Sequence, residues 1–217
     1  AHLHFTATNE YKKRVIQMGE VPKNVYCVGG LGVDNIRDTN FYAKSVLEKK
    51  LNLKFLKKIV LVTYHPETLK KKSSLSNLKN LFKALKTIQE TTVIFTMPNS
   101  DIESMVIYNT ISKFVSRRKN YHLFKSLGQK KYYSCCKYSD FMIGNSSSGL
   151  LEMPTFKKFS INIGERQSGR LKAKSVIDCI AQTKNIIKAI NFATNLTNKK
   201  KLIMLKILME KVELQKK

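Results

Sequence analysis

The sequence of 217 residues lacks several features that would assign a protein to a class at once. It contains no run of about 18 or more apolar residues, so we expect no transmembrane helix and no membrane partner. The segment Ala1–Glu10 has no charged stretch followed by an apolar one, which argues against a signal peptide. Four cysteines are too few and too irregularly spaced for a disulfide scaffold. These absences favour a soluble, cytoplasmic, globular protein.

Several chemical motifs are also missing. Cys135 and Cys136 are adjacent instead of forming a C-x-x-C pair, and the four histidines have no ligand spacing, so we expect no metal and no cofactor. No Gly-Lys-Ser/Thr sequence completes a Walker A loop, and no G-x-S-x-G elbow indicates a serine hydrolase. The stretch Gly29–Gly32 misses the dinucleotide fingerprint, and we interpret it as a structural turn.

Acidic residues are scarce, because 15 Asp+Glu oppose 40 Lys+Arg and give a formal net charge of +25. A domain this basic has the electrostatic character of a nucleic-acid binder. However, the longest lysine runs, 70–72 and 199–201, have three residues each, and no basic block alternates with aromatic residues for base stacking. We therefore expect no nucleic-acid partner, whereas attraction to a small, highly anionic ligand stays open.

Strand and helix patterns alternate along most of the chain. Apolar strand patterns occur at 58–64, 92–96, 141–143 and 159–163. Helical patterns separate them, including an apolar stripe from Leu75 to Ile88 that Ser74 or Ser76 would cap. The alternation predicts an α/β fold, with a Rossmann-like parallel sheet that helices cover on both faces. Since no Pro- or Ser-rich linker interrupts it, we expect residues 1–217 to form one domain.

Polar residues follow four successive predicted strands at the point where each strand ends. In open α/β sheets, ligands bind at the carboxyl ends of the strands, so these residues are expected to share one site. They are His65 after the first strand, Asn99 and Asp101 after the second, Asn145 to Gly149 after the third, and Glu165 and Arg166 after the fourth.

The strongest single motif is Gly144-Asn145-Ser146-Ser147-Ser148-Gly149, between a predicted strand and a helix. Glycine at each end permits a tight turn and close backbone approach, and a helix N-terminus favours an anion such as phosphate. Glu152, one turn later, could accept two ribose hydroxyls, and His65 could bind phosphate or transfer a proton. The alternatives are a serine-rich helix cap, a solvent-facing carboxylate and a structural loop histidine. Together the residues favour a phosphorylated, hydroxyl-bearing ligand, and a nucleotide in particular.

Five segments occur in the order of one known family: 8–20, 28–32, 65–68, 143–149 and 161–170. Together they resemble the hydrolysing UDP-N-acetylglucosamine 2-epimerases of nonulosonic and sialic acid biosynthesis, over residues 1 to about 180. The resemblance implies a GT-B fold, in which two Rossmann-like domains enclose the active site. It also implies that this chain is the carboxy-terminal, UDP-binding half and that a UDP-sugar is the substrate.

The resemblance implies a role for individual residues as well. His65 would lie near the diphosphate and take part in catalysis, while Asn145 and Gly149 belong to the matching serine loop. The remaining matches are Ser146 and Ser147 on phosphate, Glu152 on the ribose hydroxyls, Leu127 and Tyr132 on the uracil, Arg166 at the cleft, and Asn99 and Asp101 in a polar loop beside the sugar nucleotide.

The reaction implied is anti elimination of UDP, followed by addition of water with inversion at C2, which releases a free sugar such as N-acetylmannosamine. The acid/base carboxylates of the family belong to its amino-terminal domain, which we expect to be absent from this chain and to be supplied in cis or by a separate chain. Residues 181–217 are expected to form a divergent, Lys-rich helical tail. The chain would then be a fragment, a split-gene product or a decayed copy, inactive alone. A homo-oligomer is also possible.

Two other readings stay open from the sequence. A GT-B glycosyltransferase domain would have the same fold and nucleotide-sugar site but would transfer the sugar to an acceptor. A basic nucleic-acid-binding module would explain the charge but not the motifs.

Overall fold

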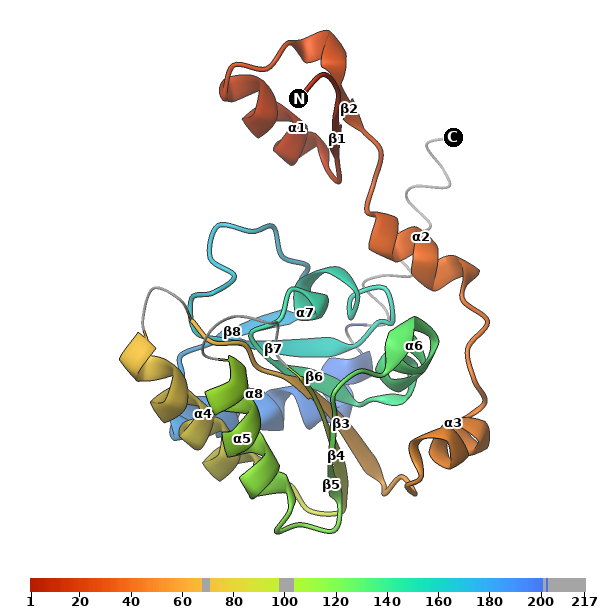
Figure 1. Ribbon diagram of the computed structural model, residues 1–217, viewed down its shortest axis with the longest axis vertical. Coiled ribbons are helices and arrows are strands. Elements are labelled where there is room, and N and C mark those ends of the chain that lie inside the picture. Colours follow the sequence, from red (N-terminus) through yellow and green to blue (C-terminus); the bar gives the residue numbers. More distant parts are fainter. Residues whose placement is uncertain (68–70, 98–103, 201, 203–217) are drawn as a thin grey trace. The chain divides into compact units, whose positions relative to one another are not determined.

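A computed structural model describes residues 1–67, 71–97, 104–200 and 202, with the backbone alone for 71–73 (Figure 1). The chain divides into two compact units, residues 1–39 and 40–217. Each unit contains its own parallel sheet. In the part of the chain that the structure describes, no helix combines the length and the apolar character needed to cross a bilayer.

The first unit is a β–α–β module followed by a helix. Thr8 caps the first helix, because its Oγ1 accepts a hydrogen bond from the Tyr11 N–H at 3.2 Å. The two strands pair in parallel. The elements are β1 (His4–Thr6), α1 (Asn9–Gln17), the 3-10 turn η1 (Pro22–Asn24), β2 (Val25–Cys27) and α2 (Leu31–Asp38).

The second unit is built on a sheet of six parallel strands. Its order is β5-β4-β3-β6-β7-β8. Successive strands are therefore added on one side of β3 up to β5, and on the other side from β6 onward. This is the strand order of a Rossmann sheet, in which ligands bind at the reversal point. The strands are β3 (Lys58–Thr63), β4 (Thr91–Thr96), β5 (Tyr121–Phe124), β6 (Phe141–Gly144), β7 (Phe159–Ile163) and β8 (Val176–Cys179).

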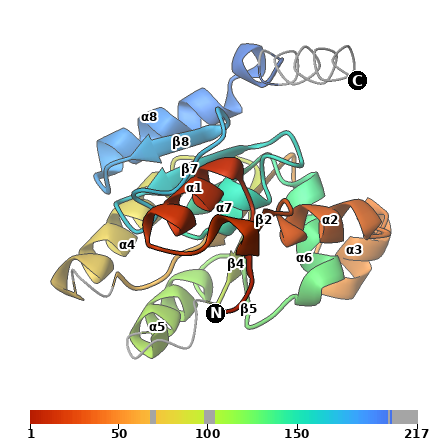
Figure 2. The ribbon, with the colours of Figure 1, turned by 90° about the horizontal axis from the view of Figure 1, so that it is seen from above.

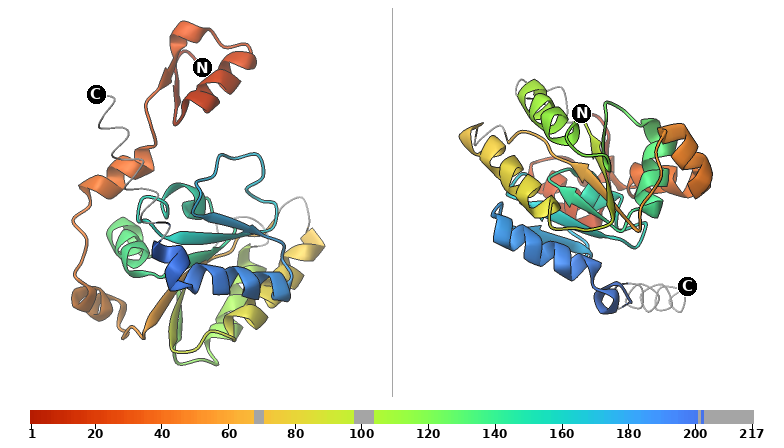
Figure 3. Two further views of the ribbon diagram at one scale, coloured as in Figure 1. Left: turned by 180° about the vertical axis from the view of Figure 1, so that it is seen from behind. Right: turned by 90° about the horizontal axis from the view of Figure 1, so that it is seen from below.

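Helices cover both faces of this sheet, as Figures 2 and 3 show. Helices α4, α5 and α8 pack on one face, and α3 and α6 pack on the other. Alternate strand residues divide between the two cores: Val60 and Val62 face the first group of helices, and Ile59 and Leu61 face the second. The helices are α3 (Lys44–Leu51), α4 (Lys71–Leu85), α5 (Ser104–Val115), α6 (Gly128–Tyr138), α7 (Ser148–Leu151) and α8 (Thr183–Thr194). The predicted Rossmann-like fold is confirmed.

The structure differs from the sequence prediction in four elements. Helix α2 begins at Leu31, inside the stretch predicted to be only a structural turn, with Gly30 as its N-cap. Helix α4 begins before the predicted caps, and Ser74 instead lies within it, where its Oγ accepts a hydrogen bond from the Glu67 N–H at 3.0 Å. The sequence pattern predicts a helix over 132–138, whereas helix α6 begins four residues earlier, at Gly128, and strand β8 was not predicted. The helix predicted at 202–214 lies almost entirely outside the described residues.

At Gly144 the backbone of β6 lies close to the backbone of β3. Its φ is +146°, and a Cβ at this position would lie 1.9 Å from the carbonyl oxygen of Thr63. The next amide, Asn145 N–H, donates to that same carbonyl oxygen at 3.1 Å. Only glycine fits here, because any side chain would push the two strands apart where the loop after β6 begins.

We predict that Gly144→Ala lowers the free energy of unfolding by more than about 2 kcal/mol, because it combines backbone strain with a clash against backbone. Gly169→Ala is the matched control, since Gly169 also has a positive φ, +74°, but nothing lies within 4 Å of its Cβ position. Gly169→Ala should lower the free energy of unfolding by about 1 kcal/mol. Urea denaturation of both variants measures the difference, and equal losses would show that the close approach at Gly144 is unimportant.

Candidate functional site

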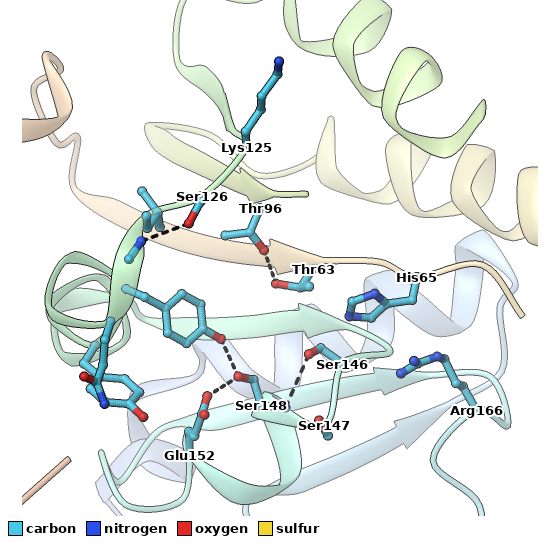
Figure 4. A pocket seen from close by; sticks show the side chains of 15 residues that line it. Thr63, His65, Thr96, Lys125, Ser126, Ser146, Ser147, Ser148, Glu152 and Arg166 are labelled. Atoms are coloured by element: carbon cyan, nitrogen blue, oxygen red, sulfur yellow. Dashed lines mark hydrogen bonds between the residues drawn. The ribbon is translucent and has the colours of Figure 1, made fainter. Parts of the chain in front are cut away.

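A pocket of about 530 Å³ lies at the carboxyl ends of the central strands of the second unit (Figure 4). Its walls come from the ends of β3 and β4 and from the connections after β5, β6 and β7. This is the edge of the sheet at which the strand order reverses between β3 and β6. The lining residues are Thr63, His65, Thr96, Lys125, Ser126, Leu127, Gly128, Gln129, Tyr132, Tyr133, Ser146, Ser147, Ser148, Glu152 and Arg166.

Most of the residues proposed from the sequence lie together in this pocket. Those that line it are His65, Leu127, Tyr132, Ser146, Ser147, Glu152 and Arg166. Asn145 and Gly149 are not among the lining residues, and both are buried. Asn99 and Asp101 lie outside the described residues.

Asn145 connects two of the loops that form the pocket. Its side chain is fully buried, and its Oδ1 accepts a hydrogen bond from the His65 backbone N–H at 2.7 Å. Its Nδ2 donates to the His65 carbonyl oxygen at 2.9 Å. One amide group therefore satisfies both backbone polar groups of His65 and fixes the loop after β3 against the loop after β6.

The backbone carbonyl of Asn145 fixes a third loop. It accepts hydrogen bonds from Arg166 Nη1 at 3.1 Å and from Gln167 Nε2 at 2.8 Å, both in the segment that follows β7. Figure 4 shows the side chains of His65, Ser146 and Arg166 at the same end of the pocket. This end combines an imidazole, a guanidinium and a hydroxyl, which is a set of groups suited to an anion.

The other end of the pocket carries a chain of hydrogen bonds that ends on a carboxylate. The Tyr132 hydroxyl donates to Ser148 Oγ at 2.6 Å, and Ser148 Oγ donates to Oε2 of Glu152 (Figure 4). Burial raises the pKa of Glu152. Burial, with Cys136 and Glu152 nearby, raises the pKa of Tyr132 well above its ordinary range, so the phenol stays neutral and donates. Among the residues that the structure describes, none donates a hydrogen bond to the second oxygen of Glu152, and a ligand hydroxyl could donate to it.

Gly149 has a structural role that the sequence did not reveal. A Cβ at this position would lie 3.3 Å from Cβ of Ser160 on β7, and the Ser160 hydroxyl donates to the Gly149 carbonyl at 2.5 Å. The N–H groups of Gly149 and Leu150 donate to the carbonyls of Ser146 and Ser147 at 3.2 and 2.9 Å. The start of α7 is thus held against the sheet, and the hydroxyls of the serine loop face the pocket instead of its glycine.

Several other lining residues were not proposed from the sequence, and Ser148 was included only as one member of the serine loop. Thr63 and Thr96 end the adjacent strands β3 and β4, and their hydroxyl oxygens lie 2.6 Å apart. Lys125 directly follows β5 and Ser148 opens α7. The rule that polar residues at strand ends form the site would have found Thr96 and Lys125. Nothing in the sequence distinguished Ser148 from its two serine neighbours or indicated Tyr133.

Comparisons with known proteins identify the family of the chain. A model of the family described as UDP-N-acetylglucosamine 2-epimerase matches residues 1–205. The chain therefore belongs to the UDP-N-acetylglucosamine 2-epimerase family. This confirms the family that the motifs indicated, and the match extends to residue 205, past the end near residue 180 of the resemblance seen in the sequence.

Two curated relatives are similar in sequence. One is the GDP/UDP-N,N'-diacetylbacillosamine 2-epimerase (hydrolyzing) of Campylobacter jejuni, 43% identical over 181 residues that cover 82% of this chain and 47% of the relative. The other is the polysialic acid biosynthesis protein P7 of Escherichia coli, 40% identical over 192 residues, or 88% of this chain and 49% of the relative. The chain thus spans about half the length of the curated relatives that it matches.

Solved structures show the same fold at low sequence identity. The S. aureus protein MnaA, solved with UDP, matches with a TM-score of 0.69 at 18% identity, over 92% of this chain and 53% of that one. The UDP-GlcNAc 2-epimerase of Methanocaldococcus jannaschii, solved with UDP-GlcNAc and UDP, matches with a TM-score of 0.68 at 16% identity, over 97% and 61%. The fold of the chain is therefore that of the GT-B-like UDP-N-acetylglucosamine 2-epimerases.

The raised pKa of Glu152 has a consequence for stability. Unfolding returns the carboxyl to its ordinary pKa of 4.5, so just above that pH the folded chain keeps a proton that the unfolded chain releases. Stability is therefore lost as the pH rises through the folded pKa.

We predict that Glu152→Gln, which can still accept from Ser148 but cannot ionise, gains stability relative to the parent chain as the pH rises from about 4 to about 7. Urea midpoints at both pH values measure the change. A stability difference for Glu152→Gln that stays constant with pH would contradict the prediction.

Proposed function

We propose that this pocket binds UDP and UDP-sugars, and that the chain is the nucleotide-binding half of a hydrolysing UDP-N-acetylglucosamine or UDP-diacetamido-sugar 2-epimerase. The observation that supports this most is the distribution of charge within the pocket. Basic groups and hydroxyls occupy one end, and the carboxylate of Glu152 occupies the other. A nucleotide has the complementary distribution, with an anionic diphosphate and a ribose that carries two neighbouring hydroxyl donors.

The diphosphate would bind at the end formed by His65, Arg166 and the serine loop. Hydrogen bonds from charged donors to phosphate oxygens are roughly twice as strong as neutral ones, and a guanidinium can contact two oxygens at once. The hydroxyls of Ser146 and Ser147 face the same space and add neutral donors. The hydrogen bonds of Asn145 hold these groups in place before the ligand arrives, so little ordering is needed on binding.

The ribose and base would occupy the rest of the pocket. Glu152 has a carboxylate oxygen available for the ribose hydroxyls, while Tyr132 and Ser148 orient the carboxylate through the other oxygen. Leu127 and Gly128 lie where the connection after β5 turns into α6, and they would contact the uracil by their backbone. The ring of Tyr132 lines the same region and would pack against the base.

The proposed reaction eliminates UDP from the sugar and then adds water with inversion at C2, which releases a free sugar such as N-acetylmannosamine. The elimination needs a base at C2 and stabilisation of the departing diphosphate. His65, Arg166 and the serine hydroxyls would supply the stabilisation, because preorganised donors act most strongly where charge develops. Glu152 is the one carboxylate among the described lining residues and is assigned to the ribose. The C2 base would therefore come from the half of the enzyme that this chain does not match.

We predict that UDP raises the melting temperature of the chain. At a UDP concentration 100 times the dissociation constant, a ligand of the native state contributes about 2.7 kcal/mol, which for a chain of this length corresponds to roughly 5–10 °C. Ser146→Ala and His65→Ala should each weaken binding about tenfold or more, because each removes a hydrogen bond to a charged phosphate oxygen. Scanning fluorimetry over a UDP titration measures both effects.

Ser116→Ala removes an exposed hydroxyl outside the pocket and is the matched control for this titration, so its shift should equal that of the parent chain. UMP, which carries one phosphate fewer, should give a smaller shift than UDP at equal concentration. No shift at millimolar UDP, or equal shifts in the parent chain and both pocket variants, would contradict the proposed site.

We also predict that the chain alone does not convert UDP-N-acetylglucosamine, because no carboxylate is assigned to C2. Proton NMR of a reaction in D₂O should show neither free N-acetylmannosamine nor deuterium at C2. Formation of free N-acetylmannosamine by the purified chain, lost in Ser146→Ala, would show that these 217 residues contain the complete catalytic machinery.

A further inference from the structure

Four exposed lysines of helices α3 and α6 lie over aromatic rings. The two helices pack against each other on one side of the sheet (Figure 2). Measured from the ammonium nitrogen to the ring centroid, Lys50 and Lys130 lie 5.0 and 4.5 Å from Tyr42, Lys44 lies 5.8 Å from Phe55, and Lys137 lies 4.9 Å from Phe41. We call Lys44, Lys50, Lys130 and Lys137 the lysine face.

Tyr42 is the residue that brings lysines of the two helices together. Its backbone N–H donates to Ser134 Oγ at 3.0 Å, and its carbonyl oxygen accepts from the Tyr138 hydroxyl at 3.0 Å. Both partners belong to α6, whereas Tyr42 lies just before α3. The ammonium groups of Lys50 and Lys130 therefore approach one fixed ring from two distant parts of the sequence. A cation–π contact also restricts a flexible lysine side chain, so less conformational freedom is lost on binding.

The positive charge of the lysine face is not neutralised by neighbouring carboxylates. Over the ranges that the structure describes, none of its four lysines forms an ion pair, whereas Lys172 elsewhere in the chain pairs with Asp178 at 2.8 Å. Helix α6 contains no acidic residue. Helix α3 contains one, Glu48, whose Oε1 accepts a hydrogen bond from the Phe55 N–H at 2.7 Å. One carboxylate therefore opposes four ammonium groups.

The arrangement of these charges favours an extended anionic surface as the partner. The ammonium groups are spread over two helices, and none of the four lysines lines the pocket. Neither helix contains arginine, the residue that binds phosphates and bases bidentately. The rings already carry ammonium groups, so they are not free to stack on bases of a nucleic acid. Lysine beside tyrosine suits the headgroup layer of a bilayer, where amphipathic side chains gather.

We propose that the lysine face binds peripherally to a bilayer rich in acidic phospholipids. Each lysine close to such a surface strengthens binding roughly fivefold, and the contact weakens as salt screens it. A second copy of the chain is not the partner, because two lysine faces repel each other. The proposal goes beyond the proposed function and is independent of it, since the lysine face and the pocket share no residue.

This proposal departs from the sequence-based expectation of no membrane partner. That expectation rested on the lack of a segment long enough to span a bilayer, which peripheral binding does not need. In the sequence the lysines of the face fall in two segments, 44–50 and 130–137, and look scattered. Only the packing of α3 against α6 shows that they form one surface.

The test is co-sedimentation of the chain with vesicles of phosphatidylglycerol and phosphatidylcholine in equal parts. The parent chain should bind these vesicles, and binding should be lost with phosphatidylcholine alone or in molar salt. Lys50→Gln, Lys130→Gln should bind roughly twentyfold more weakly, because two lysines of the face are removed. The matched control is Lys79→Gln, Lys83→Gln, which removes the same charge from exposed positions of α4 on the other side of the sheet. It should bind within about twofold of the parent chain.

A second measurement needs no substitution. Hydrogen exchange on the parent chain should slow at the amides of α3 and α6 when the anionic vesicles are bound, and should not change in α4. The proposal is overturned if the chain does not bind these vesicles, if both double variants lose binding equally, or if exchange in α3 and α6 is unchanged. It is also overturned if poly(A) RNA binds more tightly than the vesicles and depends on Lys50 and Lys130. An unchanged UDP-induced shift in the Lys50/Lys130 variant shows that its fold and its pocket are intact.

Discussion

Asn145 makes the hydrogen bonds on which the geometry of the pocket depends. It is fully buried at the point where the sheet order reverses, and its amide binds both backbone polar groups of His65. Its carbonyl accepts from Arg166 and Gln167. Three loops that are far apart in the sequence are therefore fixed by one residue that does not line the pocket. Any replacement would leave buried donors or acceptors without a partner, at a cost of about 1–3 kcal/mol for each group.

The chemistry of the pocket follows from this arrangement. With the loops fixed, His65, Arg166 and the serine hydroxyls form an anion-binding end, and the Tyr132–Ser148–Glu152 chain forms an acceptor for hydroxyls. Because the guanidinium of Arg166 and the carboxylate of Glu152 lie at opposite ends, one pocket could bind a diphosphate and a sugar ring together. The large positive charge of the chain adds general attraction for such a ligand, and no single surface lysine is required to explain it.

Much of this could be predicted from the sequence, because the buried strands of a parallel sheet are apolar runs and its ligands bind where those runs end. That rule found His65, the serine loop and Arg166. It could not show that Asn145 points at backbone, since the sequence does not reveal which way an amide side chain faces. Strand β8 is short and half-exposed, so its pattern is weak. Helix α2 was missed because two glycines precede it, and glycine was interpreted as a turn signal. The sequence did not reveal the separate first unit, because no Pro- or Ser-rich linker precedes residue 40.

The central claim is that a nucleoside diphosphate binds across this pocket in one orientation. A crystal structure of the chain with UDP tests it directly. The account predicts diphosphate oxygens within hydrogen-bond distance of His65, Ser146 and Arg166, and ribose hydroxyls on Glu152, with the Asn145 hydrogen bonds unchanged. UDP bound elsewhere on the chain, or bound here with its ribose at Arg166 and its phosphates at Glu152, would contradict it.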